Sequence, residues 1–150
     1  MTAPRTAVAL LVLAACSRGP AGPAPLDTRA ETCASCRMAV SDARFAAQLD
    51  APSEEPRFFD DVGCLRDWLA AHPRLPRGAV AWVADHRTKA WARAARAAYA
   101  EAPAVETPMA SHLLAFADAA SRAADPAAAG ARPLGPSEVF GPHGPPDGAP

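Results

Sequence analysis

The stretch Thr32-Cys33-Ala34-Ser35-Cys36-Arg37-Met38 places two thiols three residues apart and a thioether two residues later. A tight turn can bring Cys33 and Cys36 to one side of the backbone, with both sulfurs aimed at a common point. Three soft donors within six residues suit a thiophilic metal ion, above all Cu(I). The same cysteine spacing also occurs in structural zinc knuckles, in redox motifs and in thiols without a function. The rest of the sequence has to choose between these alternatives.

Composition limits the size of the fold and the class of partner. The 150 residues allow one domain or two very small ones. Half of them are hydrophobic, but much of that share is alanine and only 6% are aromatic, so we expect a thin core that a metal or partner could stiffen. The 15 basic and 16 acidic residues give a net charge of −1, and the sequence carries no basic stripe of the kind that binds nucleic acid.

The N-terminus has the features of a lipoprotein signal peptide over residues 1–15. An apolar stretch at residues 7–15 is too short to span a bilayer and has the length of a signal-peptide core. It ends in Leu13-Ala14-Ala15-Cys16, which resembles a bacterial lipobox and implies cleavage before Cys16 and acylation of that residue. Several acyl chains would anchor the protein stably to a membrane. The alternative is an ordinary secretory signal with a chance cysteine.

The segments on either side of residues 31–124 are expected to lack regular structure. Residues 16–30 are rich in Gly, Pro and Ala in their first part, which is typical of a flexible tether. Residues 125–150 hold seven prolines and five glycines in 26 residues, which predicts a disordered tail.

Between them, hydrophobic periodicity predicts an α+β fold. Strands are expected within residues 38–49, at 57–59 and at 79–84, while residues 90–99 fit either a helix or a strand. One helix is expected from a cap at Asp61 to Pro73. A second is expected to begin at Thr107-Pro108, with Met109, Leu113, Phe116 and Ala120 on one face.

A faint internal repeat accompanies these elements. An apolar run, a capping residue, a sulfur residue and an amphipathic helix occur at residues 58–71 and again at 105–120. The pattern indicates two copies of a small α+β unit, with halves at residues 31–85 and 86–124.

Three further residues are candidate ligands. Cys64 lies in the first turn of the expected helix, where backbone N–H groups favour thiolate although Asp60 and Asp61 oppose it, and it could equally be a small buried residue. Met109 lies at the start of the second expected helix, where it can either reach a site or fill the core. His112 follows three residues later, and histidines in such positions are more often surface residues than ligands.

Taken in order, these motifs resemble the NosL-type lipoproteins, which are copper-binding accessory proteins of nitrous-oxide reductase. The resemblance covers roughly residues 31–120. It rests on the lipobox, Cys33-Ala34-Ser35-Cys36-Arg37-Met38, Phe59-Asp60-Asp61-Val62-Gly63-Cys64, Trp82-Val83-Ala84-Asp85, Trp91 with Ala94, Ala95 and Tyr99, and Thr107-Pro108-Met109. Two departures stand out: members often carry glycine where this chain has Arg37, and glycine usually follows the Thr-Pro-Met sequence where this chain has Ala110.

The resemblance implies a fold of two ββαβ-type halves and a membrane-tethered Cu(I) metallochaperone that faces the periplasm. It would supply copper for maturation of nitrous-oxide reductase, directly or through its copper-delivery machinery. Cu(I) would be held by some of Cys33, Cys36, Met38 and Met109, with Cys64 or His112 in reserve. No chemical step is needed for this role, so we do not expect an enzyme.

Two alternatives stay open. A structural Zn(II) site could use Cys33, Cys36 and Cys64 with a histidine, but it leaves both methionines without a purpose. A thiol–disulfide oxidoreductase is less favoured, because such motifs typically open a helix, whereas a strand is expected after Cys36.

The lipobox leads to a first prediction. Replacing the acylated residue, Cys16→Ser, should abolish lipidation and release or mislocalise the protein, because the acyl chains are the anchor that the lipobox implies. Membrane fractionation with mass spectrometry of the mature N-terminus measures this. A Cys16→Ser protein that still fractionates with membranes as a lipidated species would contradict the lipobox.

Overall fold

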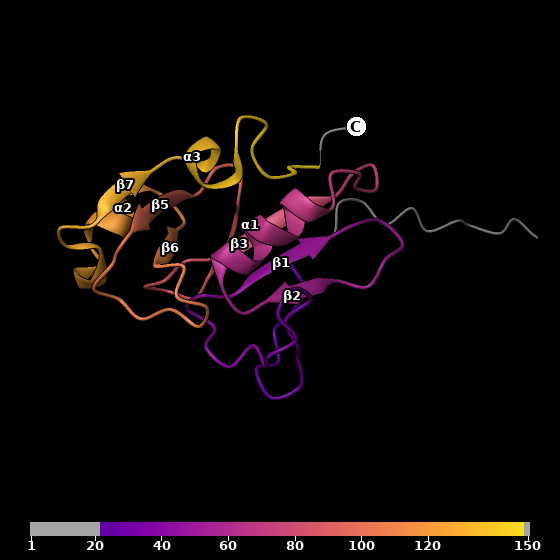
Figure 1. Cartoon of the computed structure of the whole chain (residues 1–150), viewed down its shortest axis with the longest axis horizontal. Coiled ribbons are helices and arrows are strands. Elements are labelled where there is room, and N and C mark those ends of the chain that lie inside the picture. Colours follow the sequence, from indigo (N-terminus) through magenta and orange to yellow (C-terminus); the bar gives the residue numbers. More distant parts are fainter. Residues whose placement is uncertain (1–21, 149–150) are drawn as a thin grey trace, which may run out of the picture.

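The computed structural model describes residues 22–148, which form two antiparallel sheets (Figure 1). The first sheet has the order β2-β1-β3-β4 and the second has the order β6-β5-β7. The strands are β1 (Ala47–Asp50), β2 (Arg57–Phe59), β3 (Val80–Ala84), β4 (Trp91–Arg93), β5 (Ala98–Glu101), β6 (Leu113–Phe116) and β7 (Arg132–Leu134). The helices are α1 (Val62–Ala71), α2 (Ala119–Ala123), the 3₁₀ helix η1 (Pro126–Ala128) and α3 (Pro136–Phe140). The predicted α+β class is therefore confirmed.

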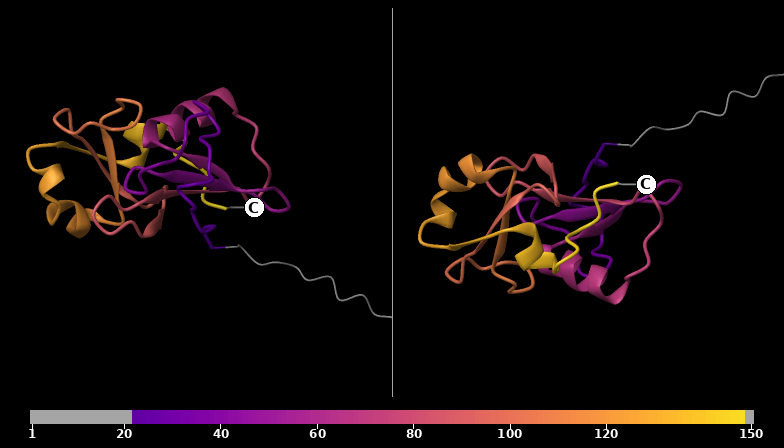
Figure 2. Two further views of the ribbon diagram at one scale, coloured as in Figure 1. Left: turned by 90° about the horizontal axis from the view of Figure 1, so that it is seen from below. Right: turned by 90° about the horizontal axis from the view of Figure 1, so that it is seen from above.

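The two halves repeat one ββαβ unit. In the first half the chain order is β1-β2-α1-β3 with β1 between its two partners, and in the second it is β5-β6-α2-β7 with β5 between its two partners. All of these pairs are antiparallel. The views from below and above show the two sheets side by side along the long axis, with α1 against one face of the first (Figure 2).

Helix α1 begins and ends where the sequence predicts. Asp61 has an extended backbone with φ −150°, and its side chain accepts a hydrogen bond from the backbone N–H of Gly63. Val62 and Leu65 face inward and are almost fully buried. The helix ends at His72, directly before Pro73, whose ring excludes the helical conformation at the preceding residue.

A polar junction after β3 joins the halves. The carboxylate of Asp85 accepts a hydrogen bond from the N–H of Ala117 at 2.7 Å, and the N–H of His86 donates to the carbonyl of Ala115 at 2.8 Å. Burial alone would raise the pKa of Asp85, but hydrogen bonds from Ala117, Ser121 and Thr88 outweigh it and lower the pKa to about 2. The His86 imidazole is buried and contacts Asp125 through Nδ1 at 2.7 Å.

The prediction of a helix that begins at Thr107-Pro108 is wrong. Residues 107–111 form a turn, closed by the Ala110 N–H to the Thr107 carbonyl at 3.0 Å, and Leu113–Phe116 is the strand β6. All four residues of β6 are buried, so their continuous apolar run serves both faces of a strand rather than one face of a helix. The helix of this unit starts after β6 instead, capped by Asp118.

The expected disordered tail is also corrected, because residues 125–148 belong to the fold. Strand β7 pairs with β5, and Leu134 and Val139 are buried. The prolines are compatible with regular structure in this segment. Pro133 lies in an edge strand and Pro136 lies at the first position of α3, and at both places a missing N–H costs little. Beyond α3 the chain returns to the first sheet, where Asp147 bridges to Val80 (Figure 1).

The described part of the expected tether, residues 22–30, contacts the domain. The side-chain amide of Gln48 accepts from the N–H of Ala24 at 2.8 Å and donates to its carbonyl at 3.1 Å, while Leu26 packs against the core. The signal peptide and Cys16 lie outside the described residues. Within residues 22–148 no helix combines the length and apolar character needed to cross a membrane.

Burial of the C-terminal segment leads to a second prediction. Leu134→Ala should lower the free energy of unfolding by about 2–5 kcal/mol, because it removes a buried side chain from β7. Ser137→Ala, at an exposed position of α3, is the matched control and should change it by less than about 0.5 kcal/mol. Denaturant titrations measure both, and equal, negligible effects would mean that the segment is not part of the folded core.

Candidate metal centre

The cysteine loop is closed by its own backbone. The N–H of Cys33 donates to the carbonyl of Met38 at 2.8 Å, and the N–H of Arg37 donates to the carbonyl of Cys33 at 3.0 Å. The Cys33 sulfur accepts the N–H of Cys36 at 3.5 Å. These bonds turn the two thiols to the same side of the loop, as the spacing predicts.

A further hydrogen bond fixes this loop to the first sheet. The N–H of Ala34 donates to the carbonyl of Phe58, in β2, at 2.8 Å. Because β2 leads directly into Asp60, the loop is held over the buried carboxylate of that residue. The Sγ of Cys36 lies 3.4 and 3.5 Å from the two carboxylate oxygens of Asp60, which accept its thiol proton.

Helix α1 adds a third thiol. One ligand atom from each of Cys33, Cys36, Asp60 and Cys64 lies within 4.8 Å of the others, a group we call the thiol cluster. All three thiols are free. Sequence reasoning included Cys64 as a reserve ligand but considered Asp60 only for its effect on the charge of Cys64. The signal for Asp60 was its place four residues before Cys64, since this spacing across a helix start can bring two side chains together.

Two thiols of the cluster, those of Cys36 and Cys64, have a raised pKa and are held in the protonated form. Burial raises the pKa of the Cys64 thiol, and the adjacent Asp60 and Cys33 raise it further. Burial likewise raises the pKa of Cys36, against a smaller lowering by a backbone hydrogen bond from Met38. At Cys64, burial and Asp60 thus raise the pKa by more than the N-terminus of the helix lowers it. Binding of a metal that requires thiolates must displace these protons, so its affinity should increase with pH.

A loop from the second half is held against the same helix end. The buried carboxylate of Asp61 accepts the N–H of Gly63 at 2.6 Å, the N–H of Met109 at 3.1 Å and the hydroxyl of Ser111. Met109 is 48 residues away from Asp61 in the chain. The helix cap thereby places the Met109 loop next to the element that carries Cys64.

Gly63 permits this close approach. A Cβ built on Gly63 would lie 2.6 Å from the Cβ of Ser111 and 3.0 Å from a carboxylate oxygen of Asp61. Any side chain here would therefore push the loop away from the helix. The order Asp60-Asp61-Val62-Gly63-Cys64 thus supplies a cluster carboxylate, a cap, a close contact and a thiol in five consecutive residues.

The remaining predicted ligands, Met38, Met109 and His112, are not members of the thiol cluster. Met38 is 57% exposed and Met109 is 42% exposed, and no other large hydrophobic side chain in residues 22–148 is exposed. The Nδ1 of His112 donates to the carbonyl of Val105 at 2.9 Å, which leaves Nε2 as the nitrogen with a free lone pair in the neutral ring.

Left-handed backbone conformations occur in both loops. Arg37 has φ 68° and Ala110 has φ 53°, and His112 follows with φ 56°. Such conformations favour glycine because a Cβ is crowded there. The two positions where the resemblance leads us to expect glycine are therefore the two where the backbone geometry favours it, although this chain carries Arg37 and Ala110.

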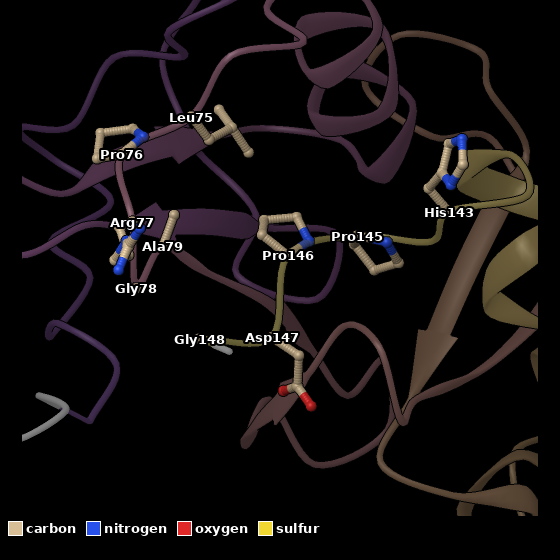
Figure 3. Close-up of a pocket in the computed structure, with 10 residues that line it drawn as sticks. All are labelled: Leu75, Pro76, Arg77, Gly78, Ala79, His143, Pro145, Pro146, Asp147 and Gly148. Carbon is tan, nitrogen blue, oxygen red and sulfur yellow. The ribbon is translucent and has the colours of Figure 1, made fainter. Parts of the chain in front are cut away.

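A separate cavity lies away from the thiol cluster. A space of about 520 Å³ is lined by residues 75–79 and by the C-terminal segment, including His143 and Asp147 (Figure 3). The side chains of Arg77, His143 and Asp147 point in different directions and do not converge (Figure 3). None of the three cysteines lines this cavity.

Three convergent thiols, a buried carboxylate and two flanking loops with exposed methionines define a thiol-rich candidate metal site in a two-sheet α+β protein. The family model NosL matches residues 23–130, which include all of the thiol cluster and the Met109 loop. The chain therefore belongs to the NosL family. No curated protein and no solved structure matches it.

The contact at Gly63 leads to a third prediction. Gly63→Ala should destabilise the protein by about 1–3 kcal/mol through overpacking, whereas the same change in an ordinary helix interior stabilises it. The matched background is Ser111→Gly, which removes the opposing Cβ, and in it the cost of Gly63→Ala should become smaller. Denaturant titrations of the four proteins give the coupling. An equal cost in both backgrounds would show that the loop does not press on the helix.

Proposed function

We propose that the protein is a Cu(I)-binding metallochaperone, tethered to the outer side of a membrane through Cys16, that supplies copper for maturation of nitrous-oxide reductase. The observation that carries the proposal is the convergence of Cys33, Cys36 and Cys64, from a loop and a helix, within 4.8 Å of one another. Membership of the NosL family supports copper as the cargo. The tether and the periplasmic location rest on the N-terminal sequence.

Ligand chemistry supports Cu(I) as the metal. Thiolates bind Cu(I) strongly, and thioethers bind it more weakly and resist oxidation better than a site of cysteines alone. Exposed thioethers on Met38, two residues after Cys36, and on Met109, in the loop held at the start of α1, fit a protein that must hold copper and then release it. A role in delivery needs no catalysed step, so the proposed function is not enzymatic.

Zn(II) is the second candidate, and Asp60 is the specific observation in its favour. A structural zinc site needs four ligands, and the thiol cluster offers three cysteines with a carboxylate in place of the histidine expected from the sequence. Zinc would not use the exposed Met38 and Met109. A thiol–disulfide role is less supported, because Cys36 is followed by a turn and strand rather than by a helix.

Metal preference is the fourth prediction. The reduced Cys16→Ser protein should bind one Cu(I) per chain in preference to Zn(II), since Met38 and Met109 are useful ligands for copper and poor ones for zinc. Competition titrations against a Cu(I) chelator under anaerobic conditions measure the affinity. Cys33→Ser with Cys36→Ser should reduce it most. Met38→Leu and Met109→Leu should weaken binding or transfer by roughly 10- to 100-fold, the range seen when residues supporting a metal site are replaced.

The methionine variants carry their own control. Met→Leu nearly conserves volume and should cost less than about 1.5 kcal/mol of stability, so a fold effect can be separated from a metal effect by a denaturant titration. Unchanged affinity and transfer in the Met38→Leu, Met109→Leu double variant would refute the thioether contribution. If the unsubstituted site prefers Zn(II), we conclude that it is a structural zinc site.

A further inference from the structure

The three thiols of the cluster are not equally accessible. Cys33 is fully buried and Cys64 is 6% exposed, whereas Cys36 is only half-buried. The residues that follow Cys36, Arg37 and Met38, are both exposed. The thiol cluster therefore opens to solvent on the side of the turn formed by residues 36–38, which we call the exchange turn.

The buried thiols are also the more firmly held. Cys33 is fixed by its N–H bond to Met38 and by the bond from Arg37 to its carbonyl. Cys64 belongs to α1, whose first turn is fastened by Asp61.

Cys36 instead lies at the start of the exchange turn, just before the left-handed Arg37. Its thiol donates only weak sulfur hydrogen bonds, at 3.4–3.5 Å to the oxygens of Asp60. Of the three sulfurs, that of Cys36 can leave the cluster with the smallest change elsewhere.

We propose that metal enters and leaves the thiol cluster through Cys36, while Cys33 and Cys64 keep hold of it, and that the partner is a protein site with soft sulfur donors approaching over the exchange turn. The inference rests on the proposed function for Cu(I) as the cargo. Its geometric basis, the unequal burial of the thiols, does not depend on which metal binds.

Ligand substitution at Cu(I) explains why the open side matters. Cu(I) accepts low coordination numbers, so an incoming thiolate or thioether can bind before a resident ligand departs. The incoming donor must reach the metal from solvent, which the burial of Cys33 and Cys64 prevents on their sides. Met38, exposed two residues after Cys36, supplies a further soft donor close to Cys36 in the chain.

Residue-specific thiol labelling tests this assignment. The full-length Cys16→Ser protein is loaded anaerobically with Cu(I), its copper content is measured, and it is exposed briefly to N-ethylmaleimide beside the metal-free protein. Peptide mapping then gives the modification rate at each cysteine. Cys36 should react about tenfold faster than Cys33 and Cys64 in both forms, because thiol reactivity follows exposure. Copper should slow all three and leave Cys36 the fastest.

The controls separate this inference from the proposed function. In the protein unfolded by guanidinium, the modification rates of the three cysteines should become similar. A difference seen only in the folded protein then comes from the fold and not from the neighbouring residues in the sequence. A protein that takes up no copper contradicts the proposed function, while the labelling order of its metal-free form still tests the inference. Modification of Cys33 or Cys64 as fast as Cys36, with or without copper, would overturn it.

Discussion

The rest of the structure depends on the hydrogen bonds that the buried carboxylate of Asp61 accepts. It accepts hydrogen bonds from Gly63 in α1 and from Met109 and Ser111 in the loop before β6. One group thus starts the helix that carries Cys64 and fastens the second half of the chain to it. Without the carboxylate, the donors of both segments would lose a buried partner, which costs about 1–3 kcal/mol for each group left unsatisfied. The same carboxylate therefore supports the helix that carries Cys64 and holds the second half of the chain against the first.

Comparison of the two repeated units shows why, within residues 22–148, only the first carries a thiol cluster. Phe59-Asp60-Asp61 before α1 corresponds to Phe116-Ala117-Asp118 before α2, and both helices start from an aspartate cap. Three residues after each cap come Cys64 and Ser121, respectively. The second unit keeps the capping geometry, but Ala117 replaces the cluster carboxylate and Ser121 the thiol. Because Ser121 instead contacts Arg87 and Asp85, the second unit uses the equivalent position for structure.

Local signals predicted those parts of the fold that local interactions decide. The Asp61 cap and Pro73 fixed the ends of α1, and the cysteine spacing indicated the turn of the thiol pair. Tertiary contacts decided the rest. Leu113–Phe116 has a helix-compatible pattern, but it pairs with β5 and contacts with α1, α2 and β3 help to bury it. The proline-rich C-terminal segment is ordered through pairing with β5, burial of Val139 and the bridge from Asp147 to Val80. The contact of Asp60 with Cys36, 24 residues away in the chain, could not be predicted from spacing, which related Asp60 only to Cys64.

The exposed methionines are best understood through the backbone that presents them. Met38 and Met109 each lie beside a residue in the left-handed conformation, Arg37 and Ala110, which is a strained arrangement for a side chain other than glycine. Strain of this kind persists only where surrounding contacts enforce it, here the Cys33–Met38 backbone bond and the Asp61–Met109 bond. The fold thus accepts a cost in stability at two positions whose apolar side chains remain largely exposed and gain little from burial. Packing does not account for this placement, whereas the proposed role of both thioethers as Cu(I) ligands does.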